Sequence, residues 1–321
     1  MVTHQTMRRG PDDITAIDAG YVRPGLAAIH VIEHGGRVAL VDTGTARSVP
    51  RVLEALVSLG YGPGDVDFVL LTHVHLDHAG GAGAFMRALP NAMLVVHPRG
   101  APHMIDPAKL VAASIEVYGE ARYRSLYGEI VPVDAARVRT TQDGEQLALA
   151  GRVLEFWFTP GHALHHQAIV DHASRTIFTG DTFGLSYREF DTARGAFIFP
   201  TTTPTQFDPQ QLESSVARIA AWRPRAVHLT HYARVDDVER LAADMTLQVR
   251  AFASLAEQHA AAADRRARIR ADMRALLRER CLAHGCTLGE TQFDALLAED
   301  LDLNADGLLA WLSRRGLSSG A

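Results

Sequence analysis

The sequence predicts a mixed α/β fold followed by a helical C-terminal extension, and three observations support this. Short apolar runs of strand length alternate with helical segments up to about residue 240. The nearly continuous apolar run at residues 66–72 is typical of a strand buried on both faces. From residue 236 onward only helical patterns occur. We therefore expect a first domain at residues 1–240 and a helical extension at residues 241–321.

The N-terminal part predicts a strand meander within residues 14–44. The apolar runs at residues 27–32 and 37–41 flank a Gly-Gly turn, which is typical of a hairpin. A helix should follow, because Pro50 suits a first helical turn and Gly60 suits a helix end.

The remaining elements follow from the same patterns of apolar spacing and turn residues. Further strands are expected at residues 93–97, 153–158, 176–179 and 226–230, the last being the final strand of the chain. Further helices are expected at residues 80–89, within 102–127, and from 207–209 to about 222. Three tyrosines recur in the second of these helices at near-helical spacing, which predicts packing; they are Tyr118, Tyr123 and Tyr127.

Charge and cysteine content narrow the class of protein. The net charge of −5 and the lack of a basic stripe argue against nucleic-acid binding, since the arginine-rich run at residues 265–270 is flanked by acidic residues. We find neither a signal peptide nor an apolar run long enough for a membrane span, so a cytoplasmic protein with no membrane partner is expected. Cys281 and Cys286 are expected to be free thiols, because two cysteines and one histidine make a weak metal or redox pattern.

The most informative stretch is residues 72–81, which follows the buried strand. It holds four potential metal ligands within six positions: His73, His75, Asp77 and His78. Imidazole nitrogen and carboxylate oxygen suit Zn, Fe or Mn. In an extended segment His73 and His75 project to the same side and can share one metal ion, while Asp77 and His78 can face a second.

Such a cluster would be energetically unfavourable without a bound metal ion. A single histidine is usually a surface residue or a satisfied core residue. Several titratable groups gathered after a buried strand would lose solvation and would repel one another at low pH unless a cation were bound. The pattern therefore predicts a metal centre.

Further motifs downstream give the cluster a family context. Thr159-Pro160-Gly161-His162 follows a predicted strand, and Phe178-Thr179-Gly180-Asp181 and Leu229-Thr230-His231 end two others. Together with the histidine cluster, and with the turn at residues 42–44, they resemble the metallo-β-lactamase superfamily over residues 14–235. The resemblance implies a four-layer αββα sandwich, with the first domain as the catalytic domain and the helical extension after it.

The resemblance also implies a set of metal ligands. His73, His75 and His162 would bind one ion, Asp77, His78 and His231 a second, and Asp181 would bridge the two. Zn is favoured for both divalent ions, with Fe or Mn as alternatives. His231 is preferred to His228 as the final ligand because it stands at the strand end, where ligands of this fold emerge, whereas His228 lies mid-strand and should be a core residue.

The implied activity is hydrolysis of a small-molecule thioester or ester by a metal-bridging hydroxide, with Asp77 and Asp181 as the catalytic carboxylates. The bridging aspartate makes the set similar to hydroxyacylglutathione hydrolases, lactonases and ribonuclease Z, rather than to true β-lactamases. The helical tail is similar to that of hydroxyacylglutathione hydrolases and quinolone-signal thioesterases.

Several alternatives stay open at this point. The same site could serve a lactonase or a phosphodiesterase, or the chain could be a metal-bound regulatory protein that binds a partner through its helical tail. That tail could cap the site or form a homodimer contact. One of His165 and His166 supports the ligands or touches substrate, or both are ordinary strand-edge residues. Asn304 is expected to cap a helix.

Overall fold

The computed structural model describes residues 6–202 and 205–316, which divide into two compact units. Unit 1 takes the described residues up to 158 together with residues 165–180 and 227–234. Unit 2 takes residues 159–164, 181–226 and the described residues from 235 on. The two units thus interleave along the chain, and a domain boundary at residue 240 stays a prediction.

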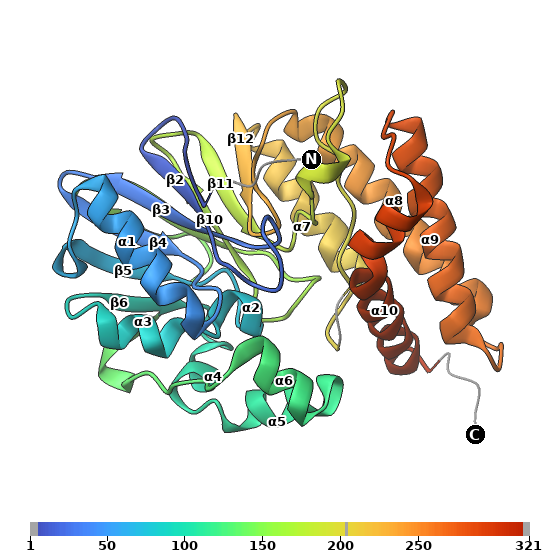
Figure 1. Ribbon diagram of the computed structural model, residues 1–321, viewed down its shortest axis with the longest axis horizontal. Helices are drawn as coiled ribbons and strands as arrows, with labels where there is room; N and C mark the ends of the chain where they lie inside the picture. Colours follow the sequence, from blue (N-terminus) through green and yellow to red (C-terminus); the bar gives the residue numbers. More distant parts are fainter. Residues whose placement is uncertain (1–5, 203–204, 317–321) are drawn as a thin grey trace. The chain divides into compact units, whose positions relative to one another are not determined.

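The first sheet contains the expected meander. Its strands, in spatial order, are β1 Met7–Arg9, β2 Ile14–Asp18, β3 Ala28–His34, β4 Arg37–Val41, β5 Val66–Leu70, β6 Met93–Val96 and β7 Val138–Thr140. Pairing is antiparallel from β1 to β4 and parallel from β4 to β7, so the sheet is mixed. Figure 1 shows the order of β2 to β6 across this sheet.

The second sheet is formed by later strands. They are β13 Ala233–Val235, β12 Ala226–Leu229, β11 Thr176–Gly180, β10 Gln167–Asp171, β9 Arg152–Phe158 and β8 Glu145–Leu149, again in spatial order. Pairing from β8 to β11 is antiparallel. The prediction that residues 226–230 form the final strand was wrong, because β13 follows them. A strand of three residues is too short to show an apolar alternation.

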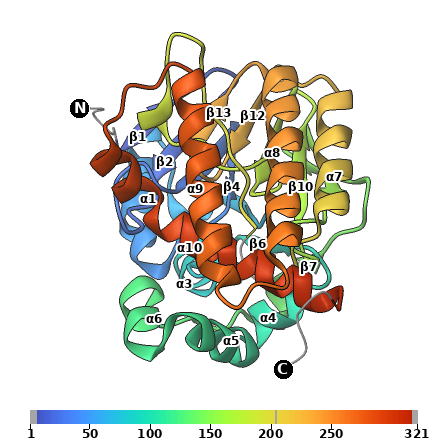
Figure 2. The same ribbon diagram turned by 90° about the vertical axis from the view of Figure 1, so that its right-hand side faces the viewer.

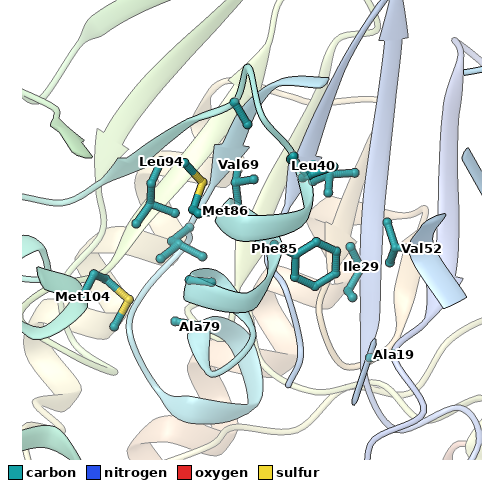
Figure 3. Packing of buried hydrophobic residues seen from close by; sticks show 14 of the residues in the cluster. Ala19, Ile29, Leu40, Val52, Val69, Ala79, Phe85, Met86, Leu94 and Met104 are labelled. Carbon is teal, nitrogen blue, oxygen red and sulfur yellow. The ribbon is translucent and has the colours of Figure 1, made fainter. Parts of the chain in front are cut away.

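The two sheets share one buried core. It joins side chains from both sheets, among them Ile32, Val41, Leu70, Phe156, Ile169 and Phe178. Helices α1 Val49–Leu59 and α3 Ala82–Ala88 cover the outer face of the first sheet. Figure 3 shows Phe85 of α3 and Val52 of α1 beside Ile29 of β3. This packing holds the strand ends, and the loops that leave them, in fixed positions.

The other helices of unit 1 are short. They are α2 Leu76–Ala79, α4 Ala101–Ile105, α5 Ala108–Tyr118 and α6 Glu120–Tyr127. The helix expected at residues 80–89 is confirmed as α3, and α2, which the sequence did not reveal, precedes it and ends before Gly80-Gly81. Tyr123 and Tyr127 are buried and Tyr118 packs edge-on against Tyr127, which confirms their packing role. Short 3-10 helices lie at Ala46–Ser48, Pro63–Asp65, Ala135–Arg137 and Arg188–Phe190.

Unit 2 contains the four long helices of the second half of the chain. They are α7 Pro209–Ala221, α8 Val238–His259, α9 Arg265–Ala283 and α10 Glu290–Arg314. Neighbouring helices pack in the order α7, α8, α9, and α10 contacts both α8 and α9 (Figure 2). The helical character expected from residue 236 is confirmed. Within the described residues, no helix combines the length and the apolar character needed to cross a membrane.

Asn304 does not cap a helix, so that prediction was wrong. It lies inside α10 and is buried. Its side-chain oxygen accepts a hydrogen bond from Thr202 N at 2.7 Å, and its Nδ2 donates to Pro200 O at 3.2 Å. The polar residue expected to end the helix instead fastens the segment at residues 200–202 to α10, because a buried amide must find hydrogen-bond partners.

Candidate metal centre

The histidine cluster lies in the loop and short helix that follow β5. His73 is fully buried, and its Nε2 lies 2.9 Å from Nδ1 of His75. The Oγ1 of Thr72 is 3.2 Å from the other ring nitrogen of His73. Two imidazole nitrogens thus converge on one point, as the extended spacing predicts.

A second convergence joins Asp77, His78 and His231. Their ligand atoms lie within 4.8 Å of one another. His231 Nε2 is 3.2 Å from Asp77 Oδ2 and 3.3 Å from His78 Nε2, and His78 Nε2 is 3.5 Å from the same carboxylate oxygen. Residues separated by more than 150 positions are brought together because β5 and β12 both end beside this loop.

Hydrogen bonds fix the tautomers of the two histidines in this triad. His78 Nδ1 donates to Asp42 Oδ2 at 2.9 Å, and His231 Nδ1 donates to Leu26 O at 2.6 Å. Since a carboxylate and a carbonyl only accept, each Nδ1 carries a proton, and Nε2 is the nitrogen left to bind a cation. Both Nε2 atoms lie beside the Asp77 carboxylate, which is an arrangement that suits a divalent cation.

Asp42 organises much of unit 1 around the triad. It is 1 % exposed and has a left-handed backbone with φ of 59°. Besides His78, it accepts hydrogen bonds from the backbone and hydroxyl of Thr72 at 2.9 to 3.0 Å and from Thr230 Oγ1 at 2.8 Å. One buried carboxylate therefore joins β4, the histidine loop and the segment that carries His231. The turn at residues 42–44, which formed part of the family resemblance, therefore supports the triad through Asp42.

Unit 2 holds the other two predicted ligands. His162 Nε2 lies 3.6 Å from Asp181 Oδ2, and His162 Nδ1 lies 3.4 Å from Thr201 O. His162 is fully buried and Asp181 is 5 % exposed. As in the triad, the imidazole has an oxygen acceptor beside Nδ1 and a carboxylate beside Nε2. The loop residue that orients His162 is next to Thr202, which Asn304 anchors to α10.

Two glycines are required where the chain enters these ligands. Gly180, at the end of β11, has φ of 47°, and an added Cβ would lie 2.6 Å from His166 Nε2 and 2.7 Å from Thr72 Oγ1. Gly161 has φ of 129°, and its Cβ would lie 2.3 Å from the backbone of Leu212 in α7. Neither position has room for a side chain, which explains the glycine in each motif.

His165 and His166 support the cluster from within unit 1. The ring of His166 stacks on that of His73 at a centroid distance of 4.9 Å, and the ring of His165 lies edge-on to that of His75 at 5.5 Å. His165 Nδ1 also accepts a hydrogen bond from Val74 N at 3.4 Å. Of the two roles considered for these residues, the supporting one matches these contacts.

The buried pair His30 and His228 shows what sequence reasoning identified and what it missed. His228 is a core residue, as expected, and stacks on Phe178 at 4.7 Å. His30, whose ring lies 5.3 Å from that of His228, had no local motif to reveal it. Burial lowers the pKa of His30 to about 4, partly opposed by Asp42, and burial also lowers that of His228. Both are neutral side chains of the inter-sheet core.

Comparison with known proteins agrees with the fold and the ligand pattern. The model of the metallo-beta-lactamase superfamily matches residues 22–231, more than half of the chain. The chain belongs to this superfamily. The predicted fold class, an αββα sandwich with a C-terminal helical region, is thereby confirmed, and membership supports a hydrolase with His/Asp clusters for divalent metal ions.

Individual relatives share part of the chain. The metallo-beta-lactamase fold-containing protein ST1585 of Sulfurisphaera tokodaii is 25 % identical over 67 % of this chain and 77 % of its own length. Its crystal structure superposes with a TM-score of 0.66 at 20 % identity, covering 93 % of this chain and 99 % of that one, which shows the fold alone.

Two further relatives carry the names of enzymes. A hydroxyacylglutathione hydrolase of Pseudomonas paraeruginosa is 31 % identical over 61 % of this chain. An atrochrysone carboxyl ACP thioesterase of Aspergillus fumigatus is 27 % identical over 48 % of it. The chain spans 57 % and 38 % of the lengths of these two relatives.

Proposed function

We propose that this protein is a binuclear metal-dependent hydrolase that cleaves a small-molecule thioester or ester. The observation that carries the proposal is the convergence of Asp77, His78 and His231, in which both imidazoles have Nδ1 occupied and Nε2 available. This donor set fits a divalent cation in ligand type and in the ring nitrogen that each imidazole presents.

The residues that would hold the ions follow from the family pattern. Asp77, His78 and His231 would hold one ion, His73, His75 and His162 the other, and Asp181 would contact both. β9 and β11 are both antiparallel to β10, so their C-terminal ends lie at the same end of the sheet. The chain continues from these two strand ends to His162 and to Asp181. When bound, two divalent ions supply Lewis acidity and lower the pKa of water, which is the chemistry that acyl hydrolysis needs.

The chain's own contribution is to orient these ligands. Asp42 and the carbonyl of Leu26 keep two imidazoles in the tautomer that can bind a metal ion. His73 and His78 are fully buried, so bulk water does not compete for their hydrogen bonds. Asp77 is the more accessible carboxylate, with 21 % of its side chain exposed. A substrate carbonyl would therefore approach from the side of Asp77.

A thioester or ester is the favoured substrate class. Two relatives are named as a thioesterase and a hydroxyacylglutathione hydrolase. The acidic net charge gives no support for a phosphodiester polymer as substrate. Lactone opening and phosphodiester cleavage are the outcomes against which the proposal is tested.

The test uses purified, metal-loaded protein on a panel of acyl-thioesters, aryl esters, homoserine lactones and bis(p-nitrophenyl) phosphate. We expect thioester or ester turnover, and we expect Asp181→Asn to abolish it. Asp134→Asn is the matched control, because Asp134 is an exposed N-cap whose role asparagine performs equally well. Full activity of Asp181→Asn, or turnover confined to lactones or phosphodiesters, would overturn the proposal.

A further inference from the structure

The C-terminal end of α9 brings together Cys281 and Cys286, the two cysteines of the chain. Cys286 N donates to Cys281 O at 3.0 Å, and Gly285 N donates to Leu282 O at 2.9 Å. Gly285 has φ of 91°. These two hydrogen bonds and the left-handed glycine define a Schellman cap, in which the first and last residues bring their side chains into contact.

In most proteins that contact is made by two apolar side chains, and here it is made by two thiols. Cys281 is fully buried and Cys286 is 5 % exposed. Both are free thiols. Burial, followed by a hydrogen bond with the Cys286 thiol, raises the pKa of the Cys281 thiol to about 12. The sulfurs are therefore neighbours whose approach is fixed by the backbone, and such preorganisation favours bond formation between them.

We propose that Cys281 and Cys286 form a redox-active dithiol that closes to an intrachain disulfide across the C-terminal cap of α9. This inference is independent of the metal centre and of the proposed hydrolysis. It assigns an oxidative modification site to the helical part of unit 2.

Closing the disulfide is a two-electron oxidation, and the oxidant is a peroxide such as hydrogen peroxide. Cys286 is the more exposed thiol, so it reacts first. Its sulfur takes one peroxide oxygen to give a sulfenic acid, and the other oxygen leaves as water, or as the alcohol of an organic hydroperoxide. The sulfur of Cys281 then attacks that of Cys286, the S–O bond breaks, and water leaves as the S–S bond forms. The dithiol has lost two electrons and two protons, and an external dithiol reverses the change by exchange.

The cap itself does not depend on the sulfurs. Thr192 Oγ1 donates to His284 O at 3.0 Å and Arg194 Nη1 donates to Ala283 O at 2.6 Å, so two cap carbonyls are held by the loop at residues 192–195. Single cysteine substitutions should therefore keep the fold and isolate the redox chemistry.

The test treats the full chain with hydrogen peroxide, alkylates it under denaturing conditions and measures its mass. Because the chain has two cysteines, every thiol signal comes from this pair, and trypsin leaves both on one peptide between Arg280 and Arg314. We expect both thiols to disappear together, the peptide to lose the mass of two hydrogen atoms, and dithiothreitol to restore it.

Single variants provide the matched control. In Cys281→Ser the remaining Cys286 thiol should oxidise to a sulfenic acid, which dimedone traps. If the buried hydroxyl changes the circular dichroism spectrum, the variant Cys281→Ala is used in place of Cys281→Ser. The proposal is overturned if both wild-type thiols remain alkylatable, if they oxidise independently at the rates of the single variants, or if disulfides form only between chains.

Discussion

Replacing Asp42 by asparagine should weaken metal binding, although Asp42 is not itself one of the proposed metal ligands. The carboxylate holds the Nδ1 proton of His78 at 2.9 Å and thereby leaves Nε2 free to bind an ion. Asparagine has nearly the same shape but only one acceptor oxygen; when that oxygen accepts from Thr72 N, the amide nitrogen, which only donates, takes the place of Oδ2 and faces the His78 proton. The ring would then favour the tautomer in which Nε2 carries the proton and is unable to bind.

Loss of such a supporting hydrogen bond usually lowers metal affinity by about 10- to 100-fold, which corresponds to roughly 1.4 to 2.8 kcal/mol. Competition with a chromophoric chelator at fixed pH measures this loss. Thr230→Val is the control, because it removes a 2.8 Å donor from the same carboxylate oxygen but leaves the bond to His78 in place. Equal metal affinities for wild type and Asp42→Asn, or equal losses in both variants, would refute this reasoning.

Three further predictions test the packing. His30 has a pKa of about 4 in the folded protein and about 6.5 in the unfolded chain, so the free energy of unfolding falls as the pH drops through this interval. At about 1.4 kcal/mol per pH unit the loss is about 3 kcal/mol. His30→Leu should reduce this pH dependence in urea unfolding, and an equal pH dependence in both proteins would contradict the prediction. Asn304→Leu leaves buried hydrogen-bonding groups unpaired and should lower the unfolding free energy by about 3 kcal/mol, so an unchanged denaturation midpoint would count against the anchoring role. Gly161→Ala should lower the free energy of unfolding by about 3 kcal/mol, because Gly161 has φ of 129° and its Cβ would meet the Leu212 backbone. Gly36→Ala is the control: Gly36 has φ of 76° but lies in open space, so the loss should be about 1 kcal/mol. A larger loss for Gly36→Ala than for Gly161→Ala would exclude the steric explanation.

The sequence was informative where function and structure depend on short local patterns. The hairpin around residues 34–36, the buried strand at β5 and the helix from Asp208 could be predicted because turn residues and apolar spacing lie within a few positions of one another. The same holds for the histidine cluster, whose chemistry is concentrated in one loop.

What could not be predicted depends on contacts between distant segments. The hydrogen bonds of Asp42 come from Thr72, His78 and Thr230, and no local pattern relates these positions. Asn304 was expected at a helix end because asparagine is a good cap, but its partners lie about one hundred residues earlier in the chain. For Asn304, tertiary hydrogen bonding overrode the local preference of asparagine for a cap.

The most direct test of this account is anomalous X-ray diffraction from metal-loaded crystals, recorded on both sides of the metal absorption edge. We predict two anomalous peaks, one among Asp77, His78 and His231 and the other among His73, His75 and His162, with Asp181 in contact with both. A protein that takes up no stoichiometric metal, or peaks located away from these side chains, would contradict the account.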